Sequence, residues 1–176
     1  MARILGVDPG LTRCGFGVVE SGMKAIDFGL FQSAPGTDPR DRVGSIAAEL
    51  DALILRYKPE LIALERVFAQ ANLRSVMGVA QISGALMASA HKHDIPLQFF
   101  TPSEVKLAVT GHGRAAKDQV GEMVTRLLKL EETPKPADVA DALAVAICAH
   151  KKALGVGTAA QQKWVAAAKA ANRRLG

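Results

Sequence analysis

Four acidic side chains in this chain stand where a solvated surface acid is not expected. They are Asp8, Glu65, Asp138 and Asp141. The first two each end a run of apolar residues with the character of a buried strand, and a carboxylate there is costly to desolvate unless it is paired or bound to a cation. The last two are three residues apart in an alanine-rich stretch. Taken together, the four acids predict a metal site.

The pair Asp138 and Asp141 has a simpler explanation when it is taken alone. Acidic residues are favoured in the first turns of a helix, where the positive end of the helix dipole lies, and a spacing of three places both on one face. Asp8 and Glu65 change this interpretation, because neighbouring strands lie only about 4.8 Å apart and two strand ends can bring both carboxylates to one sheet edge. A helix N-terminus that covers this edge would complete the cluster.

The residue types indicate which chemistry such a cluster would serve. Four carboxylates in one pocket repel one another, so they either gain protons at raised pKa values or bind divalent cations. With no Cys or His at a coordinating spacing, the oxygen donors favour Mg²⁺, with Mn²⁺ as a substitute, over zinc. Two such ions about 3.5 to 4 Å apart can bridge a phosphodiester, one activating a water and the other stabilising the leaving oxygen. We expect metal-assisted phosphodiester hydrolysis with two ions in each active site.

Alternating strand and helix patterns must position these acids. Short turns separate the first three predicted strands and indicate an antiparallel meander, whereas helices join the later strands, which normally gives parallel, right-handed connections. The predicted strands are residues 3–8, 14–20, 24–31, 61–65 and 95–100. The predicted helices begin at residues 38–39 (N-cap and proline), near 72, at the capping box 101–104, after the glycines of 111–113 and near 136. This order predicts an α/β, ribonuclease H-like fold, with a mixed five-stranded sheet and helices on both faces.

The helix of residues 72–91 has two possible partners for its apolar side chains. Its spacing predicts a stripe that faces the core, formed by Val76, Val79, Ala80, Ser83, Leu86 and Met87. A face with Val76, Met77, Val79 and Ala80 would also suit an interface between two copies of the chain, because a two-fold interface uses the same patch on both subunits. The sequence leaves both alternatives open.

Composition and charge indicate one domain with a basic tail. At 176 residues and 49% hydrophobic content, the chain is long enough for one core, which we place in residues 1–154. Six of the 22 basic residues follow Asp141 and no acidic residue does, so the excess charge lies at the end of the chain. We expect residues 155–176 to be a flexible, Ala-rich tail, which suits a polyanion, although many basic tails only aid solubility.

Targeting signals and cysteine usage predict a cytoplasmic protein. No apolar segment approaches the roughly 20 residues that a membrane span needs, and no secretory signal pattern opens the chain. Cys14 and Cys148 are far apart and lack ligand-like spacing. We therefore expect two buried thiols in a reducing compartment.

Five motifs occur in order between about residue 2 and about residue 150. They are Gly6-Val7-Asp8-Pro9-Gly10 with Thr12 and Gly15, Ala63-Leu64-Glu65-Arg66-Val67-Phe68, Pro102-Ser103-Glu104-Val105-Lys106 through Val109-Thr110-Gly111, Ala116-Lys117 with Val120, and Ala137-Asp138-Val139-Ala140-Asp141-Ala142-Leu143-Ala144. In sequence and order they resemble the motifs of the RuvC Holliday junction resolvases. This resemblance implies that Asp8, Glu65, Asp138 and Asp141 are the metal-binding catalytic acids of a Mg²⁺-dependent crossover junction endodeoxyribonuclease with the ribonuclease H-like fold.

The resemblance also implies partners. Members of this family act as homodimers that make paired, symmetric nicks in four-way junction DNA during recombination and DNA repair. They work with the branch-migration proteins RuvA and RuvB. Neither the periodicity nor the charge pattern of this chain identifies the surfaces that these contacts would use.

Several further residues are candidates for holding DNA. Phe68, three residues after Glu65, matches a family position associated with wedging against an unstacked base, with core packing as the alternative. Lys106 and Lys117 resemble the basic family positions that hold phosphates near the metals, although most lysines only solvate a helix face. Arg114, Arg74 and Thr12 are further candidate DNA contacts. Thr12 and Arg13 lie in the first turn and can reach the backbone near Asp8.

Three other functions compete with this interpretation. An actin- or sugar-kinase-like ATPase also begins with a strand that ends in Asp before glycines and a Thr, but the chain is too short for two such lobes and has no second Asp-Gly phosphate loop. A non-catalytic nucleic-acid-binding module has no use for four converging acids, because without bound metals they would repel the phosphates of the nucleic acid. A related ribonuclease H-like nuclease that acts on RNA is the third alternative, and only the order and spacing of the five motifs argue against it.

Overall fold

The structure, a computed structural model, describes residues 2–66 and 73–153 of the chain. The strands are β1 (Arg3–Asp8), β2 (Arg13–Glu20), β3 (Lys24–Gln32), β4 (Leu61–Glu65) and β5 (Leu97–Phe100). The helices are α1 (Pro39–Tyr57), α2 (Leu73–Lys92), α3 (Pro102–Thr110), α4 (Lys117–Leu128) and α5 (Ala137–Ala153). The expected tail, residues 155–176, lies outside the described residues.

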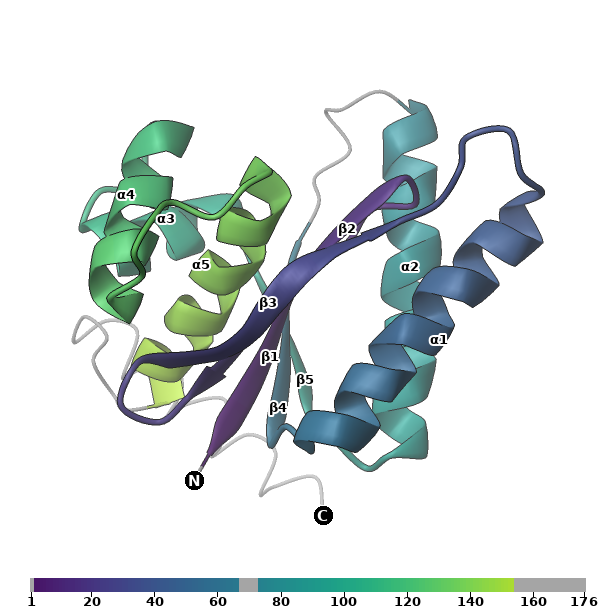
Figure 1. Cartoon of the computed structure of the whole chain (residues 1–176), viewed down its shortest axis with the longest axis horizontal. Helices are drawn as coiled ribbons and strands as arrows, with labels where there is room; N and C mark the ends of the chain where they lie inside the picture. The colour runs from purple at the N-terminus through teal and green to yellow at the C-terminus, as the bar shows by residue number, and fades with distance from the viewer. Residues whose placement is uncertain (1, 67–72, 154–176) are drawn as a thin grey trace, which may run out of the picture.

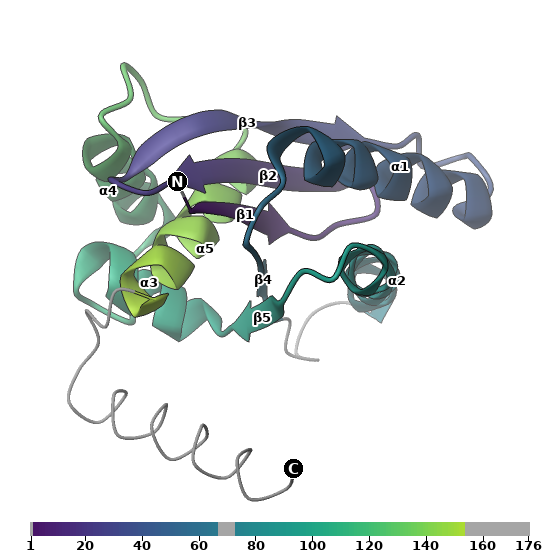
Figure 2. The ribbon, with the colours of Figure 1, turned by 90° about the horizontal axis from the view of Figure 1, so that it is seen from below.

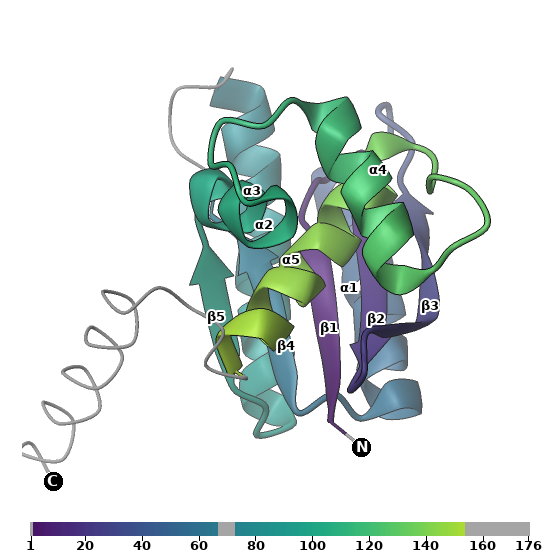
Figure 3. The same ribbon diagram turned by 90° about the vertical axis from the view of Figure 1, so that its left-hand side faces the viewer.

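The five strands form one mixed sheet in the order β3-β2-β1-β4-β5. The meander β1-β2-β3 is antiparallel, and β1, β4 and β5 are parallel to one another. Figure 1 and Figure 3 show the long β2 and β3 beside the shorter parallel strands. The mixed five-stranded sheet predicted from the turns and crossovers is therefore confirmed.

Helices cover both faces of the sheet, as predicted. Figure 2 shows α1 and α2 on one side and α3, α4 and α5 on the other. Each side has its own core, one around Leu50, Ile62 and Leu86 and the other around Leu143, Ile147 and Val124. The sheet separates two apolar layers, which is the usual way in which an α/β domain buries both faces of its strands.

Helix α1 follows the predicted pattern. The side chain of Asp38 accepts a hydrogen bond from the Arg40 N–H at 2.8 Å, and Pro39 takes the first helical position. Lys58 ends the helix in the left-handed conformation at φ 47°. The helix buries Ile46, Leu50, Leu53 and Ile54, whose spacing of one, three and four residues forms one apolar face.

Helix α2 corrects the predicted core stripe. The helix buries Gly78, Ile82, Leu86 and Ala90, whereas Ala80 is exposed and Met87 is 49% exposed. Of the residues predicted to point inward, only Leu86 is fully buried, and Val76, Val79 and Ser83 are half-buried. Apolar residues occur on more than one side of this helix, so periodicity alone could not select the face that packs on α1 and the sheet.

Helix α5 lies unusually close to the first two strands. A Cβ added at Gly15 would lie 2.1 Å from the carbonyl oxygen of Asp138, and one added at Gly6 would lie 2.2 Å from that of Ala142. No side chain fits in either space, so the glycines allow the backbone of α5 to rest on β1 and β2. This contact fixes where α5 begins relative to the strand ends.

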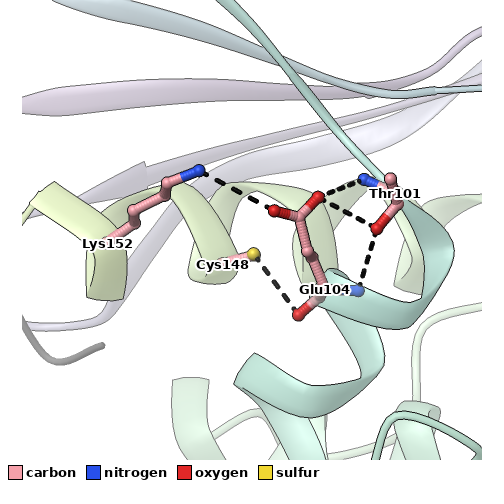
Figure 4. Close-up of polar contacts among 4 residues, drawn as sticks. All are labelled: Thr101, Glu104, Cys148 and Lys152. Atoms are coloured by element: carbon pink, nitrogen blue, oxygen red, sulfur yellow. Dashed lines mark hydrogen bonds and ion pairs between the residues drawn. The ribbon is translucent and has the colours of Figure 1, made fainter. Parts of the chain in front are cut away.

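A polar cluster joins the start of α3 to the end of α5 (Figure 4). The Thr101 hydroxyl accepts from the Glu104 N–H at 3.2 Å, and Glu104 accepts from the Thr101 N–H at 2.8 Å, which confirms the predicted capping box. The other Glu104 oxygen lies 3.9 Å from the Lys152 ammonium, and the Cys148 thiol donates to the Glu104 carbonyl at 3.7 Å. This cluster positions α3 against α5.

Cys14 and Cys148 are buried free thiols, as predicted. Within the described ranges, no helix combines the length and apolar character that crossing a membrane requires.

Candidate active site

Asp8 and Glu65 lie at the same edge of the sheet. They end the neighbouring parallel strands β1 and β4, in which Val7 is paired with Leu64. Because the two strands run in the same direction, their last residues emerge side by side. The expected convergence of the two strand-end acids is confirmed.

The first turns of α5 bring the other two acids to this edge. Asp8 is paired with Gly15 on β2, and the Asp138 backbone lies directly against Gly15. Asp141 follows one turn later on the same helix. The fold therefore gathers two strand ends and one helix N-terminus, whose residues are far apart in the sequence.

The acids influence one another electrostatically. Burial raises the pKa of Asp8 from 3.8 to about 7, with further contributions from the negative charges of Asp141, Glu65 and Asp138, while Lys117 opposes the shift. Burial, followed by the charge of Asp141, also raises the pKa of Glu65. Crowded carboxylates that hold protons more tightly than usual are what a cation site is expected to show when no cation neutralises them.

Two basic side chains partly neutralise the helix acids. The Lys117 ammonium donates to Asp141 Oδ2 at 3.1 Å, and the Arg13 guanidinium donates to Asp138 Oδ2. The charge of Asp141, followed by this hydrogen bond, raises the pKa of Lys117. The acids that end the strands have no ion pair of this kind among the described residues.

A cavity of about 250 Å³ opens beside the acids. Its polar lining consists of Glu65, Asp141, Lys106 and Lys117, and its apolar lining of Pro102, Val105 and Val120. Carboxylates and ammonium groups thus share one concave surface. A phosphodiester suits this combination, because the lysines can bind its oxygens while the acids hold cations.

The donor set fits a hard divalent cation. All four acids offer oxygen ligands. The nearby Cys14 is not a competing soft ligand, because burial raises the pKa of its thiol to about 12. In residues 2–66 and 73–153, however, no three His, Cys, Asp or Glu side chains are gathered closely enough to hold a metal ion. The carboxylates of Asp138 and Asp141 instead face Arg13 and Lys117.

The candidate DNA contacts occupy different positions around this site. Lys106 is half-buried in the cavity wall, and Arg114 is exposed in the segment between α3 and α4. The Thr12 hydroxyl accepts a hydrogen bond from Arg42 at 2.8 Å. Phe68 and the side chain of Arg74 lie outside the described part of the chain, so their roles stay predictions.

Sequence reasoning missed the contact that Arg13 makes. Arg13 pairs with Asp138, which is 125 residues away, and its expected contact with the backbone near Asp8 stays a prediction. Arg42, which fixes the turn before Arg13 through Thr12, was missed as well. The only sequence signal was that Arg13 follows Asp8 within one short turn.

Comparisons with known proteins identify the family of the chain. The model of the family described as "Crossover junction endodeoxyribonuclease RuvC" matches residues 4–150. The RuvC of Frankia alni is 51% identical over 150 residues, covering 83% of this chain and 76% of that protein. The RuvC of Saccharopolyspora erythraea is 46% identical over 176 residues, covering 98% and 88%.

Solved structures show the same likeness. The structure of Thermus thermophilus RuvC aligns with a TM-score of 0.79 at 33% identity, covering 87% of this chain and 96% of that one. T. thermophilus RuvC in complex with a Holliday junction substrate aligns with a TM-score of 0.81 at 34% identity, covering 88% and 97%. The ribonuclease H-like fold predicted from the order of elements is thereby confirmed.

Proposed function

The chain belongs to the RuvC family of crossover junction endodeoxyribonucleases, and we propose that it resolves Holliday junctions by metal-dependent phosphodiester hydrolysis during recombination and DNA repair. The observation that carries this proposal is the convergence of four acids at one sheet edge, beside a cavity that Lys106 and Lys117 also line. A likeness to a resolvase bound to a Holliday junction substrate supports the choice of DNA. Family membership also argues against the kinase-like, non-catalytic and RNA-directed alternatives.

We assign the metal ligands to Asp8, Glu65, Asp138 and Asp141. This set would hold two Mg²⁺ ions, for which Mn²⁺ can substitute, since it offers only carboxylate oxygens. When bound, the ions supply an activated water and neutralise charge at the leaving oxygen.

The remaining site residues bind and orient the substrate. Lys106 and Lys117 hold phosphate oxygens from the rim of the cavity, and the N-terminal end of α5 adds the positive end of its dipole. Pro102, Val105 and Val120 form the apolar part of the cavity wall. Phe68 is proposed to wedge against an unstacked base, and Arg74, Arg114 and Thr12 are proposed as further contacts to the DNA.

The active form is proposed to be a homodimer, because symmetric cutting of a four-way junction needs two active sites. Helix α2 offers an apolar surface for this contact. Met77 is 55% exposed and Met87 49% exposed on it, next to Val76 and Ala80. Such a surface suits a self-complementary interface. RuvA and RuvB are proposed as partners in the cytoplasm on the basis of family membership.

The proposal is tested with purified protein and a synthetic four-way junction. We expect cleavage with Mg²⁺ or Mn²⁺ and none without a divalent ion. Asp8→Asn should still bind the junction, but its cleavage should be at least about 1,000-fold slower, because losing a metal ligand removes several kcal/mol of transition-state stabilisation. Glu49→Gln, which changes an exposed acid of α1, is the matched control and should cut normally.

A linear duplex and an RNA–DNA hybrid belong in the same assay. Both should be poor substrates beside the four-way junction. Cleavage that persists without divalent metal, or that is equal on all three substrates, would contradict the proposed function.

A further inference from the structure

Each helix acid of the site is held by a basic side chain from a different element. Arg13, at the start of β2, pairs with Asp138, and Lys117, at the start of α4, pairs with Asp141. The acids are largely covered, with side-chain exposures of 20% and 21%, whereas those of the two cations are 50% and 76%. Exposed positive groups therefore lie over largely covered negative ones.

The backbone that carries Arg13 is anchored. Arg42 of α1 donates to the Thr12 hydroxyl at 2.8 Å and to the Ser33 hydroxyl at 2.9 Å. The Ser33 N–H donates to the Thr12 carbonyl at 3.1 Å, and the Ser33 hydroxyl donates to the Leu11 carbonyl. These bonds tie the turn between β1 and β2 to the segment before α1. The backbone at Arg13 is thus held in place, and a change of partner requires only its side chain to move.

A guanidinium and a divalent cation compete for the same carboxylate oxygens. While Arg13 holds Asp138 Oδ2, that oxygen is less available to a metal ion. Half-exposed ion pairs contribute only up to about 1 kcal/mol. A partner that binds the Arg13 guanidinium more strongly can therefore replace Asp138. A DNA phosphate is such a partner, because arginine binds it with two parallel hydrogen bonds.

We propose that Arg13 is a positioning residue that latches Asp138 in the free protein and transfers to a DNA phosphate when a junction binds. Its release frees Asp138 for the metal, so junction binding and metal binding reinforce each other. Coupling between two ligands is reciprocal, and bound metal should therefore tighten junction binding by the same factor. This inference rests on the proposed function and adds a control on when the metal site assembles.

The test measures Mn²⁺ binding, not cleavage. The Mn²⁺ dissociation constant is determined by electron paramagnetic resonance for wild type and Arg13→Ala, with and without a four-way junction whose integrity is checked on a denaturing gel. In the free protein, Arg13→Ala should bind Mn²⁺ about fivefold more tightly, which corresponds to about 1 kcal/mol. The factor by which the junction tightens Mn²⁺ binding should fall about fivefold relative to wild type.

Two further variants control for charge and folding. Arg40→Ala removes an arginine that is 87% exposed and pairs with Asp41 on the surface, and it should behave as wild type. Arg13→Lys keeps a cation with a weaker grip and should fall between wild type and Arg13→Ala. Thermal melts confirm that each variant is folded.

Each remaining outcome overturns a defined statement. Unchanged Mn²⁺ affinity in free Arg13→Ala would refute the latch, even if wild type cuts junctions as proposed. An equal gain with and without DNA would show a plain charge effect and refute the coupling. A wild-type protein that does not bind the junction would overturn the proposed function and the coupling together.

Discussion

The two faces of the sheet are packed in different ways. On the α1 and α2 face, large side chains such as Leu50, Ile54 and Leu86 fill the space between helix and strand. On the other face, α5 approaches β1 and β2 so closely that Gly6 and Gly15 meet its backbone. The first arrangement can adjust when a side chain changes, whereas the second cannot. The face that carries the acids is thus the one with the least tolerance for displacement.

Electrostatics separates the two faces further. The raised pKa values of Asp8 and Glu65 show that the α5 side concentrates unfavourable charge at its edge. The side covered by α1 and α2 has no comparable cluster among the described residues. Both faces thus contribute buried apolar side chains, but the α5 face also carries the cost of its crowded acids.

The largest effect is expected where α5 meets the strands. In Gly15→Ala, the added Cβ would lie 2.1 Å from the Asp138 carbonyl oxygen, and neither group can move without shifting α5. We expect a loss of about 3 kcal/mol or more in unfolding free energy. Junction cleavage should also be lost, because Asp138 moves away from Asp8. Urea unfolding and a cleavage assay measure the two effects.

Gly44→Ala is the matched control on the opposite face. Gly44 is exposed in α1 and nothing lies within 4 Å of an added Cβ. This change should raise stability by about 0.5 to 1 kcal/mol through helix propensity. If Gly15→Ala were as harmless as Gly44→Ala, the close contact of α5 with β2 would be disproved.

A deletion on the α1 face should separate stability from activity. Leu50 is completely buried, and Leu50→Ala should lower the unfolding free energy by about 3 kcal/mol because it leaves a cavity. The cleavage rate per folded molecule should stay near that of wild type, since α1 does not line the acid site. Denaturant titration and single-turnover kinetics test this.

Leu55→Ala is the control for this deletion. Leu55 lies on the same helix but is 58% exposed, so its loss should change stability by no more than about 0.5 kcal/mol. A selective loss of cleavage by fully folded Leu50→Ala would show that the two faces are not independent.

The smallest change is a gain in stability at the acid site. Raising the Asp8 pKa from 3.8 to about 7 costs the metal-free fold about 4 kcal/mol once the carboxyl is ionised. Asp8→Asn removes this cost, but the buried amide lowers the unfolding free energy by about 2 kcal/mol. The metal-free variant should thus be about 2 kcal/mol more stable than wild type at about pH 8, as measured by thermal or urea unfolding.

The pH dependence follows from the direction of the shift. Because the folded-state pKa lies above the unfolded value, the carboxyl favours unfolding increasingly as the pH rises from 3.8 towards about 7. The advantage of Asp8→Asn should accordingly shrink as the pH falls through this window. An advantage that stays constant with pH would show that charge is not its cause, and Glu49→Gln should show no advantage at all.

The sequence predicted the frame of the site better than its details. The bounds of β1 and β4 follow from two apolar runs that each end in an acid, so the sequence alone predicts Asp8 and Glu65 at one edge of the sheet. The capping residues Asp38 and Thr101 can be recognised in the sequence, so the first residues of α1 and α3 were predicted as well.

Other features depend on contacts between distant segments. The buried face of α2 was predicted wrongly because its apolar residues surround the helix, and packing on α1 decides which of them are covered. The pairing of Arg13 with Asp138 joins residues 125 positions apart, and no local spacing encodes it. The sequence contains the glycines, Gly6 and Gly15, that let α5 lie against β1 and β2, but it does not indicate which helix they contact.

Helix α5 contacts all five strands and both neighbouring helices, α3 and α4, and its residues from Ala142 to His150 are all buried. An element with so many partners cannot open by itself, so its amide hydrogens should exchange with solvent only when the whole domain unfolds. Asp138 and Asp141 are therefore mounted on the slowest-opening part of the molecule. The spacing between these two acids should persist for as long as the domain itself remains folded.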